Sequence, residues 1–300
     1  MVTRADYLKL HFLVFLWGFS GILGKLVSIP AYEMVFYRSL LSAIGMAVVI
    51  VVLREGFSVT RRQFVNLMLI GGIVGVHWVA FFESARVSNV SVSLVGFATN
   101  SLWTAILDPL FQKRPIKRFE LILGCIVILG LYIIFSFDFH YPLGLTLGVG
   151  AGFTSALFAS FNSRMVKTVP AFTITFYEMA GAFLTLAVFL PVYRLMLAEN
   201  ASLNLVPTGM DWIYMIILAG VCSVYAYTAA IELMKKISVF LIQLTLNLEP
   251  VYGIIMAVII FGSEEKMDLN FYAGTLTILS AVLVYPYLKK KYNKRITLHP

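Results

Sequence analysis

Charged side chains are scarce in this sequence. They make up 13 % of its 300 residues, against about 25 % in an average soluble domain. Cysteine occurs only twice, which excludes a disulfide-stabilised scaffold. The polar side chains are too few to cover a soluble globule, and the apolar content of 60 % is too high for a disordered chain. The composition therefore indicates an integral membrane protein.

Long polar segments are missing as well. Apolar runs of about 20 residues, the length that crosses a bilayer as a helix, follow one another along the whole chain. Their continuously apolar character excludes a transmembrane β-barrel, whose strands alternate apolar and polar residues. We therefore predict an all-α integral membrane protein with ten transmembrane helices, near residues 8–29, 31–53, 63–86, 88–112, 118–137, 142–164, 171–195, 210–234, 239–262 and 268–288.

The basic residues are unevenly distributed among the predicted connections. With the N-terminus in the cytoplasm, 18 of the 23 Lys and Arg residues lie on the cytoplasmic side and 4 on the other. The positive-inside rule then predicts that both termini are cytoplasmic. The net charge of +8 therefore reflects this topology rather than a nucleic-acid partner. The opposite side is acidic, with Asp138, Glu199, Asp211, Glu264, Glu265 and Asp268.

Short motifs recur in the same order along the two halves of the chain. Residues 30–37 recur at 170–177, 75–79 at 220–224 and 124–129 at 274–279. A unit of five helices is odd in number, so the second unit enters the membrane from the opposite side. We therefore predict two inverted five-helix repeats, residues 1–138 and 139–300, with a substrate site near the midplane between them.

Several motifs resemble the drug/metabolite transporter superfamily, in its ten-helix EamA branch. They are Trp17-Gly18-Phe19-Ser20, Phe36-Tyr37-Arg38, Leu248-Glu249-Pro250-Val251, Phe261-Gly262 with Glu264 and Glu265, and Gly274. The first half departs from the family pattern, with Asn100-Ser101 where a proline is usual. The resemblance implies an inner-membrane carrier that exports amino acids or other small metabolites by alternating access, often coupled to protons.

The Glu249-Pro250 pair lies in the middle of the ninth predicted helix. Proline removes one backbone donor and frees the carbonyl of Leu246, and such breaks persist in membranes where neighbours or a cavity satisfy the freed group. One interpretation is a cavity in which Glu249 carries a proton or cation; the other is a structural kink. Glu178 occupies the position of Arg38 in the second repeat and is a further candidate for coupling.

Arg38 and His77 are ionisable residues at membrane depth. Such residues usually face the interior of the bundle. Arg38 either anchors a substrate carboxylate or forms an ion pair with Glu33, Glu178 or Glu249. His77 either relays protons or is a hydrogen-bonded core residue.

Aromatic and amide side chains cluster near the expected midplane. Apolar walls with a few converging polar groups are typical of a small-ligand pocket, although helix packing and interfacial belts use the same residues. Together with Arg38 and His77, the predicted substrate-binding residues are Trp17, Trp78, Asn100, Trp103, Asn162, Tyr225, Tyr227, Gln243 and Asn247.

The sequence thus predicts a secondary-active transporter of a small-molecule substrate in the lipid bilayer, as a monomer or homodimer, with protons as a coupling ion. We expect no catalytic residues, cofactor, metal or nucleic-acid partner. The alternatives are a facilitative uniporter or importer, an intramembrane enzyme and a channel.

Overall fold

The computed structural model describes residues 2–88, 90–135, 141–196, 202–252, 256 and 269–298. Within these ranges the regular structure is helical, with no β-strand. Some features used in the sequence predictions lie outside the described residues: residues 253–255 and 257–262 of the span 239–262, with Phe261-Gly262, and the charged residues Asp138, Glu199, Glu264, Glu265, Lys266 and Asp268.

The first half of the chain forms six helices. The first begins four residues earlier than predicted, because Thr3 and Asp6 form a capping box that satisfies the first backbone N–H groups. Thr60 and Gln63 form the same motif at the start of the third helix. The helices are α1 (Arg4–Leu26), α2 (Ala31–Val52), α3 (Arg61–Val87), α4 (Val90–Phe97), α5 (Thr99–Gln112) and α6 (Arg118–Phe135).

The second half contributes further helices, including one π-helix. The last described helix extends ten residues beyond the predicted end of its span, so the basic tail is helical. The helices are α7 (Pro142–Met165), α8 (Ala171–Met196), α9 (Gly209–Ile217), the π-helix η2 (Leu218–Tyr227), α10 (Thr228–Leu233), α11 (Val239–Leu246) and α13 (Leu269–Leu298).

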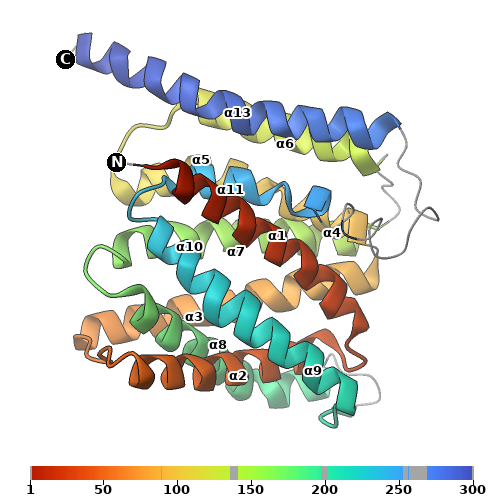
Figure 1. The fold of residues 1–300 in the computed structure, drawn as a ribbon. Helices are drawn as coiled ribbons and strands as arrows, with labels where there is room; N and C mark the ends of the chain where they lie inside the picture. The colour runs from red at the N-terminus through yellow and green to blue at the C-terminus, as the bar shows by residue number, and fades with distance from the viewer. Residues whose placement is uncertain are drawn as a thin grey trace.

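The helices form a bundle with a pair of helices at each edge. Figure 1 shows α6 beside α13 at one edge and α2 beside α8 at the other, and each pair is in contact. Helices α1, α3, α4, α5, α7, α11 and the α9–η2–α10 segment lie between these pairs. Both ends of the chain lie at the same end of the bundle (Figure 1).

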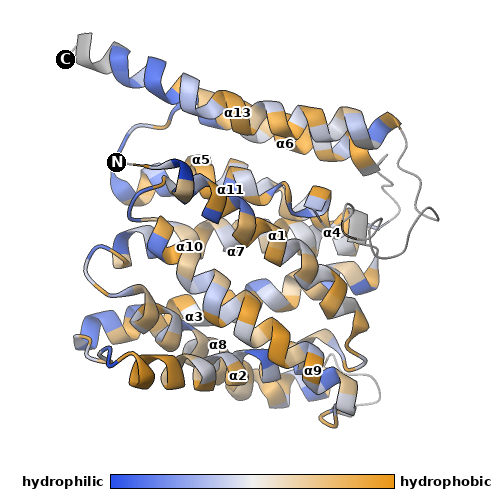
Figure 2. Cartoon of the chain, in the orientation of Figure 1, coloured by the Kyte–Doolittle hydropathy of each residue, from blue (hydrophilic) through white to orange (hydrophobic). Residues whose placement is uncertain are grey.

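Six of the described helices are long and apolar enough to cross a membrane. They cover residues 4–24, 31–52, 61–87, 142–165, 171–196 and 209–233. Figure 2 shows hydrophobic residues over much of the length of these helices and hydrophilic residues at several helix ends and along the C-terminal part of α13. The count of ten spans stays a prediction.

Three predicted helices are interrupted rather than continuous. The span 88–112 is divided into α4 and α5 at Ala98, where the hydroxyl of Thr99 donates to the carbonyl of Gly96 at 2.7 Å and competes with the helical hydrogen bonds. The span 210–234 contains η2. Helix α11 ends at Leu246, a turn covers residues 247 and 248, and helical structure resumes at Glu249. This last break lies where Pro250 predicts it.

Glycine allows α3 and α8 to cross closely. A Cβ atom on Gly71 of α3 would clash with the backbone of Glu178 on α8, and one on Gly181 of α8 would clash with the backbone of Met68 on α3. These two glycines therefore permit a backbone-to-backbone approach, as small residues do in membrane helices. The crossing holds Glu178 deep in the bundle, where its side chain is fully buried.

Candidate functional site

A cavity lies between helices from both halves of the sequence. Its walls come from α1, α2, α3, α4, α7, η2, α10 and α11, and it encloses about 780 Å³, counting the part open to the surroundings. Seven of the residues predicted from sequence line this central cavity: Trp17, Arg38, His77, Trp78, Tyr227, Gln243 and Glu249.

Arg38 projects from α2 into the central cavity and is 2 % exposed. Its Nε donates to the Ser223 hydroxyl at 3.0 Å, and its guanidinium carbon lies 4.1 Å from the centroid of the Trp78 ring. Among the described residues, no carboxylate forms an ion pair with it. The ion pair considered as one role for Arg38 is therefore not formed at contact distance, although Glu249 lies within electrostatic range of the guanidinium.

Glu249 lines the same cavity, directly after the break between α11 and the following helical turn. Its side chain is 7 % exposed, and within the described part of the chain no group donates a hydrogen bond to it. A buried carboxylate without a hydrogen-bond donor is costly, and Arg38 lies within electrostatic range of this one. The cavity thus contains one basic and one acidic group that form no ion pair at contact distance.

Two amide side chains support the break before Glu249. The amide nitrogen of Asn247 donates to the carbonyl of Gln243 at 3.0 Å and reaches the amide oxygen of Asn100 at 3.4 Å. Gln243 in turn donates to the Ser155 hydroxyl at 3.1 Å. Asn100 and Asn247 are buried but do not line the cavity. Asn247 satisfies backbone carbonyls next to the break, whereas the amide nitrogen of Asn100 has no partner in the described structure.

His77 lies on the cavity wall, surrounded by aromatic rings. Its Nδ1 lies 2.8 Å from the Ala151 carbonyl oxygen, so a proton on Nδ1 satisfies both groups. The rings of Phe97 and Phe158 lie 5.7 Å and 5.3 Å from it, measured between centroids. This environment matches the interpretation of a hydrogen-bonded core residue, while its cavity position keeps it accessible to a ligand.

Glu178 is linked to the cavity through Tyr227. The Tyr227 hydroxyl donates to the Glu178 carboxylate at 2.7 Å, and the amide of Asn162 donates to the same carboxylate oxygen at 3.1 Å. The second carboxylate oxygen of Glu178 is buried without a hydrogen-bond partner in the described structure. Tyr227 lines the cavity, whereas Glu178 and Asn162 lie behind it. The three side chains form a buried hydrogen-bonded cluster in which Tyr227 connects the cavity to the carboxyl group of Glu178.

The π-helix η2 forms one wall of the cavity. The Ser223 hydroxyl donates to the carbonyl of Leu218, five residues earlier, at 3.2 Å, and Trp17 of α1 donates to the carbonyl of Cys222 at 3.1 Å. These contacts use backbone acceptors along a stretch in which the helix is widened. π-Helical segments often mark functional sites because they present side chains in an altered register.

Two predicted residues lie away from the cavity. Tyr225 is 48 % exposed, packs edge-on against Phe12 of α1 and does not line the central cavity. It lies two residues from Tyr227 on η2, and only Tyr227 lines the cavity, so the two tyrosines point in different directions. Trp103 packs against Phe153 and does not line the cavity.

Sequence reasoning missed much of the aromatic wall. Phe81, Phe82, Phe97 and Phe158 all line the cavity. A signal was available, because residues 77, 78, 81 and 82 fall on one face of a helix at spacings of one, four and five positions. Phenylalanine is so common in this sequence, with 24 residues, that this face does not stand out.

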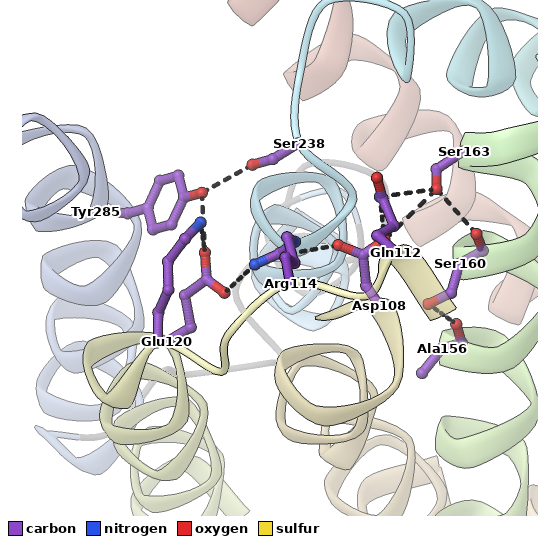
Figure 3. A network of polar contacts seen from close by, with 10 residues as sticks. Asp108, Gln112, Arg114, Glu120, Ala156, Ser160, Ser163, Ser238 and Tyr285 are labelled. Carbon is purple, nitrogen blue, oxygen red and sulfur yellow. Dashed lines mark hydrogen bonds and ion pairs between the residues drawn. The ribbon is translucent and has the colours of Figure 1, made fainter. Parts of the chain in front are cut away.

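A second polar cluster lies outside the cavity, and Figure 3 shows it from close by. Arg114 pairs with Asp108 and lies 3.8 Å from a Glu120 oxygen, and Lys117 contacts Glu120 at 3.0 Å. Both carboxylates are buried. We call this cluster the Glu120 network; it joins α5, α6, α7, α13 and the start of α11 through Asp108, Gln112, Arg114, Lys117, Glu120, Ser163, Ser238 and Tyr285.

Comparisons with known proteins agree with this architecture. The chain is 27 % identical over 161 residues to the pseudopaline exporter CntI of Pseudomonas aeruginosa, from both strain UCBPP-PA14 and strain PAO1. The match covers 52 % of this chain and spans about half the length of these relatives, 55 % of each. A crystal structure superposes with a TM-score of 0.76 at 12 % identity, over 96 % of this chain and 99 % of that one, which shows that the fold is shared.

The family itself is shown by a model that matches the chain twice. The model of the EamA-like transporter family matches residues 7–136 and again residues 142–285. Together the two matches cover most of the sequence, and the structure has membrane-spanning helices around a central cavity. The chain therefore belongs to the EamA-like transporter family, part of the drug/metabolite transporter superfamily.

Proposed function

We propose that this protein is a secondary-active transporter that exports amino acids or other small metabolites or drug-like solutes by alternating access. The observation that carries the proposal is the central cavity, where Arg38 and Glu249 are buried among aromatic rings and form no ion pair at contact distance within the described residues. Membrane proteins keep ionisable side chains at depth where a substrate or ion contacts them. A small solute with a charged group fits this chemistry.

The contacts between the two halves support the proposal of inverted repeats. Tyr37 of α2 donates to the carbonyl of Leu205, in the segment after α8, at 2.8 Å. Tyr177 of α8 donates to the carbonyl of Phe57, in the segment after α2, also at 2.8 Å. The tyrosines are 140 residues apart and their acceptors 148. Such a reciprocal exchange is expected when two similar units are related by a two-fold axis.

The helix pairs at the edges support the same symmetry. Gly130 of α6 approaches Ile278 of α13, while Gly274 of α13 approaches Ile134 of α6, so each contact recurs 144 residues later. The two matches of the family model, to residues 7–136 and 142–285, fall close to the proposed repeats 1–138 and 139–300. We therefore retain ten spans in two units of five as part of the proposal.

We further propose the inner membrane as the location, with both termini in the cytoplasm. Both ends of the chain lie at the same end of the bundle, as an even number of spans requires (Figure 1). The basic residues of the sequence are concentrated on that side, which the positive-inside rule assigns to the cytoplasm.

Proton coupling is assigned to the two cavity-linked carboxyl groups. Glu249 faces the cavity directly, and Glu178 reaches it through the Tyr227 hydroxyl. A proton on either group would neutralise it while the transporter reorients, which avoids moving a bare charge through a low-dielectric state. Glu249 is the first candidate for the coupling residue, because it faces the cavity directly and no group in the described structure donates a hydrogen bond to it.

Export is the direction that the relatives support, since two of them are named exporters of pseudopaline. The test is flux in proteoliposomes of defined orientation, with radiolabelled candidate solutes on either side and an imposed pH gradient. Saturable, gradient-dependent accumulation against a solute gradient supports secondary-active transport. Saturable flux that only equilibrates the solute indicates a uniporter, and non-saturable flux indicates a channel.

A further inference from the structure

A second cavity lies at the end of the bundle where the two chain termini are found. Tyr7 of α1, Lys236 and Leu241 at the α10–α11 connection, and Tyr285 and Lys289 of α13 are among its lining residues. It encloses about 690 Å³, counting the part open to the surroundings. It shares no lining residue with the central cavity, so transport of the substrate does not account for it.

Three lysines line this second cavity, and only one of them has an acidic partner among the described residues. Lys236 donates to Asp6 at 2.9 Å. Lys289 is half-buried, with its amine 5.7 Å from the centroid of the Tyr285 ring, and Lys290 is exposed. Among the described residues, neither Lys289 nor Lys290 has a carboxylate partner.

The nearest buried carboxylate does not offset this charge. Glu120, below Tyr285, is already contacted by Lys117 at 3.0 Å and approached by Arg114 at 3.8 Å. Glu120 and both of these cations lie within electrostatic range of Lys289, so one acidic and two basic side chains act on it. The local excess of positive charge therefore calls for an anion from outside the chain.

The deeper walls of the second cavity are apolar. Ile237 is buried, Leu241 is buried, and Pro286 extends the apolar surface along α13. Cations at a rim above apolar side chains match a molecule with an anionic head and a hydrocarbon tail. The cavity also lies where the apolar part of α13 gives way to its basic tail, the level expected for lipid headgroups.

We propose that this cavity binds an anionic phospholipid, with Lys289 and Lys290 contacting the headgroup phosphate and Ile237 and Leu241 packing against an acyl chain. A bound lipid of this kind contacts α1, the α10–α11 connection and α13 together. It therefore stabilises the folded arrangement of these elements in proportion to its affinity.

The test uses the full chain purified in a neutral detergent. We expect dioleoyl-phosphatidylglycerol to raise the thermal midpoint by about 2–4 °C, the shift that roughly 1 kcal/mol produces in a chain of this size. Dioleoyl-phosphatidylcholine has the same chains without the net charge and should leave the midpoint unchanged. Glycerol 3-phosphate, which has the phosphate without the chains, should also have no effect.

Two variants with equal net charge test the location. Lys289→Gln/Lys290→Gln removes the two unpaired lysines and should abolish stabilisation by phosphatidylglycerol. Lys9→Gln/Lys291→Gln removes two charges at the same end of the bundle but outside the cavity, and should keep it. Equal losses in both variants would overturn the proposal in favour of a diffuse electrostatic attraction.

Further outcomes are decisive as well. Equal stabilisation by glycerol 3-phosphate would replace the lipid with a soluble phosphate compound, and stabilisation by phosphatidylcholine would remove the role of charge. If the double variant fails to fold, Lys290→Gln alone, at an exposed position, should still weaken retention of phosphatidylglycerol in native mass spectrometry. None of these measurements depends on transport, so they stand or fall separately from the proposed function.

Discussion

The central cavity and the Glu120 network both hold charged side chains inside the helix bundle, but only the network pairs them. Asp108 and Glu120 are each contacted by a basic side chain, and hydroxyl and amide groups supply additional hydrogen bonds (Figure 3). Arg38 and Glu249 in the cavity lie within electrostatic range of each other but form no ion pair at contact distance in the described structure.

This difference separates structural from functional charge. Removing one member of a buried ion pair leaves the other charge uncompensated, so substitutions in a paired network lower the free energy of unfolding. A charge without a partner in a cavity gains most from a ligand that brings the opposite charge. We therefore expect network substitutions to act on stability and cavity substitutions to act on transport.

The largest effect is expected for Arg38→Met. A hydrogen bond from a charged group contributes about 1.5–3 kcal/mol, so transport of an anionic or zwitterionic substrate should fall about 10- to 100-fold. The variant also loses the hydrogen bond to Ser223, the stacking on Trp78 and the positive charge within electrostatic range of Glu249, so flux is normalised to folded protein and the thermal midpoint is measured alongside it. The measurement is initial flux per reconstituted molecule, with Arg38→Lys as the control that retains the charge. Wild-type flux in Arg38→Met would end the assignment of this cavity as the substrate site.

The next effect concerns coupling. With an imposed gradient of one pH unit, one coupled proton sustains about tenfold accumulation, and Glu249→Gln should reduce this to equilibration while exchange of substrate continues. Accumulation ratio and counterflow are measured on the same vesicles. If accumulation persists, Glu178→Gln and His77→Gln are tested next; coupling that survives all three substitutions would favour uniport or another coupling ion.

For Asp108→Asn we expect a loss of stability rather than of transport. The substitution keeps the shape of the side chain and leaves Arg114 without its carboxylate, at a cost of about 1–3 kcal/mol, below the full value for buried pairs because Arg114 is 25 % exposed. Thermal unfolding in detergent measures it. Asp108→Asn/Arg114→Gln should lose less than the sum of the single losses. Strictly additive losses would mean that the pair is not energetically coupled.

A smaller effect is expected for Tyr227→Phe. It removes the hydroxyl that donates to Glu178 but keeps the ring in the cavity wall. Loss of one hydrogen bond to a charged or polarised group contributes about 1 kcal/mol, or roughly fivefold, to the balance between the two states of Glu178. The pH profile of flux should therefore shift while the substrate KM stays constant. An unshifted profile with a raised KM would make Tyr227 a substrate contact only.

The smallest effect is expected for Tyr225→Ala. Tyr225 lies outside the cavity and is exposed, so flux per molecule should remain within about twofold of the wild type, in line with the small energetic effects of most surface substitutions. It serves as the matched control for Tyr227, two positions away on the same helical segment. A large loss of flux in this variant, at unchanged expression, would place the substrate path outside the central cavity.

Much of the architecture was predictable from local signals. Apolar runs located the membrane helices, and Pro250 marked the break that the structure shows between Leu246 and Glu249. The break at Ala98 was missed because no proline marks it; hydroxyls of Thr99 and Ser101 that bond nearby carbonyls accompany it instead. Proline removes a donor whatever its surroundings, whereas a hydroxyl interrupts a helix only in a particular packing environment.

The sequence by itself determined that this is a helical membrane protein of the drug/metabolite transporter type. Only the tertiary structure decided that Tyr227 lines the cavity while Tyr225 faces outward, that Arg38 stacks on Trp78 rather than pairing with an acid, and that Asp108 belongs to a closed network. Hydropathy along a single helix is a local property, so the sequence is enough to identify a membrane helix. The direction in which a side chain points and the partner it finds depend on the rotation of its helix and on the helices packed against it. Those contacts come from residues that are distant in the sequence.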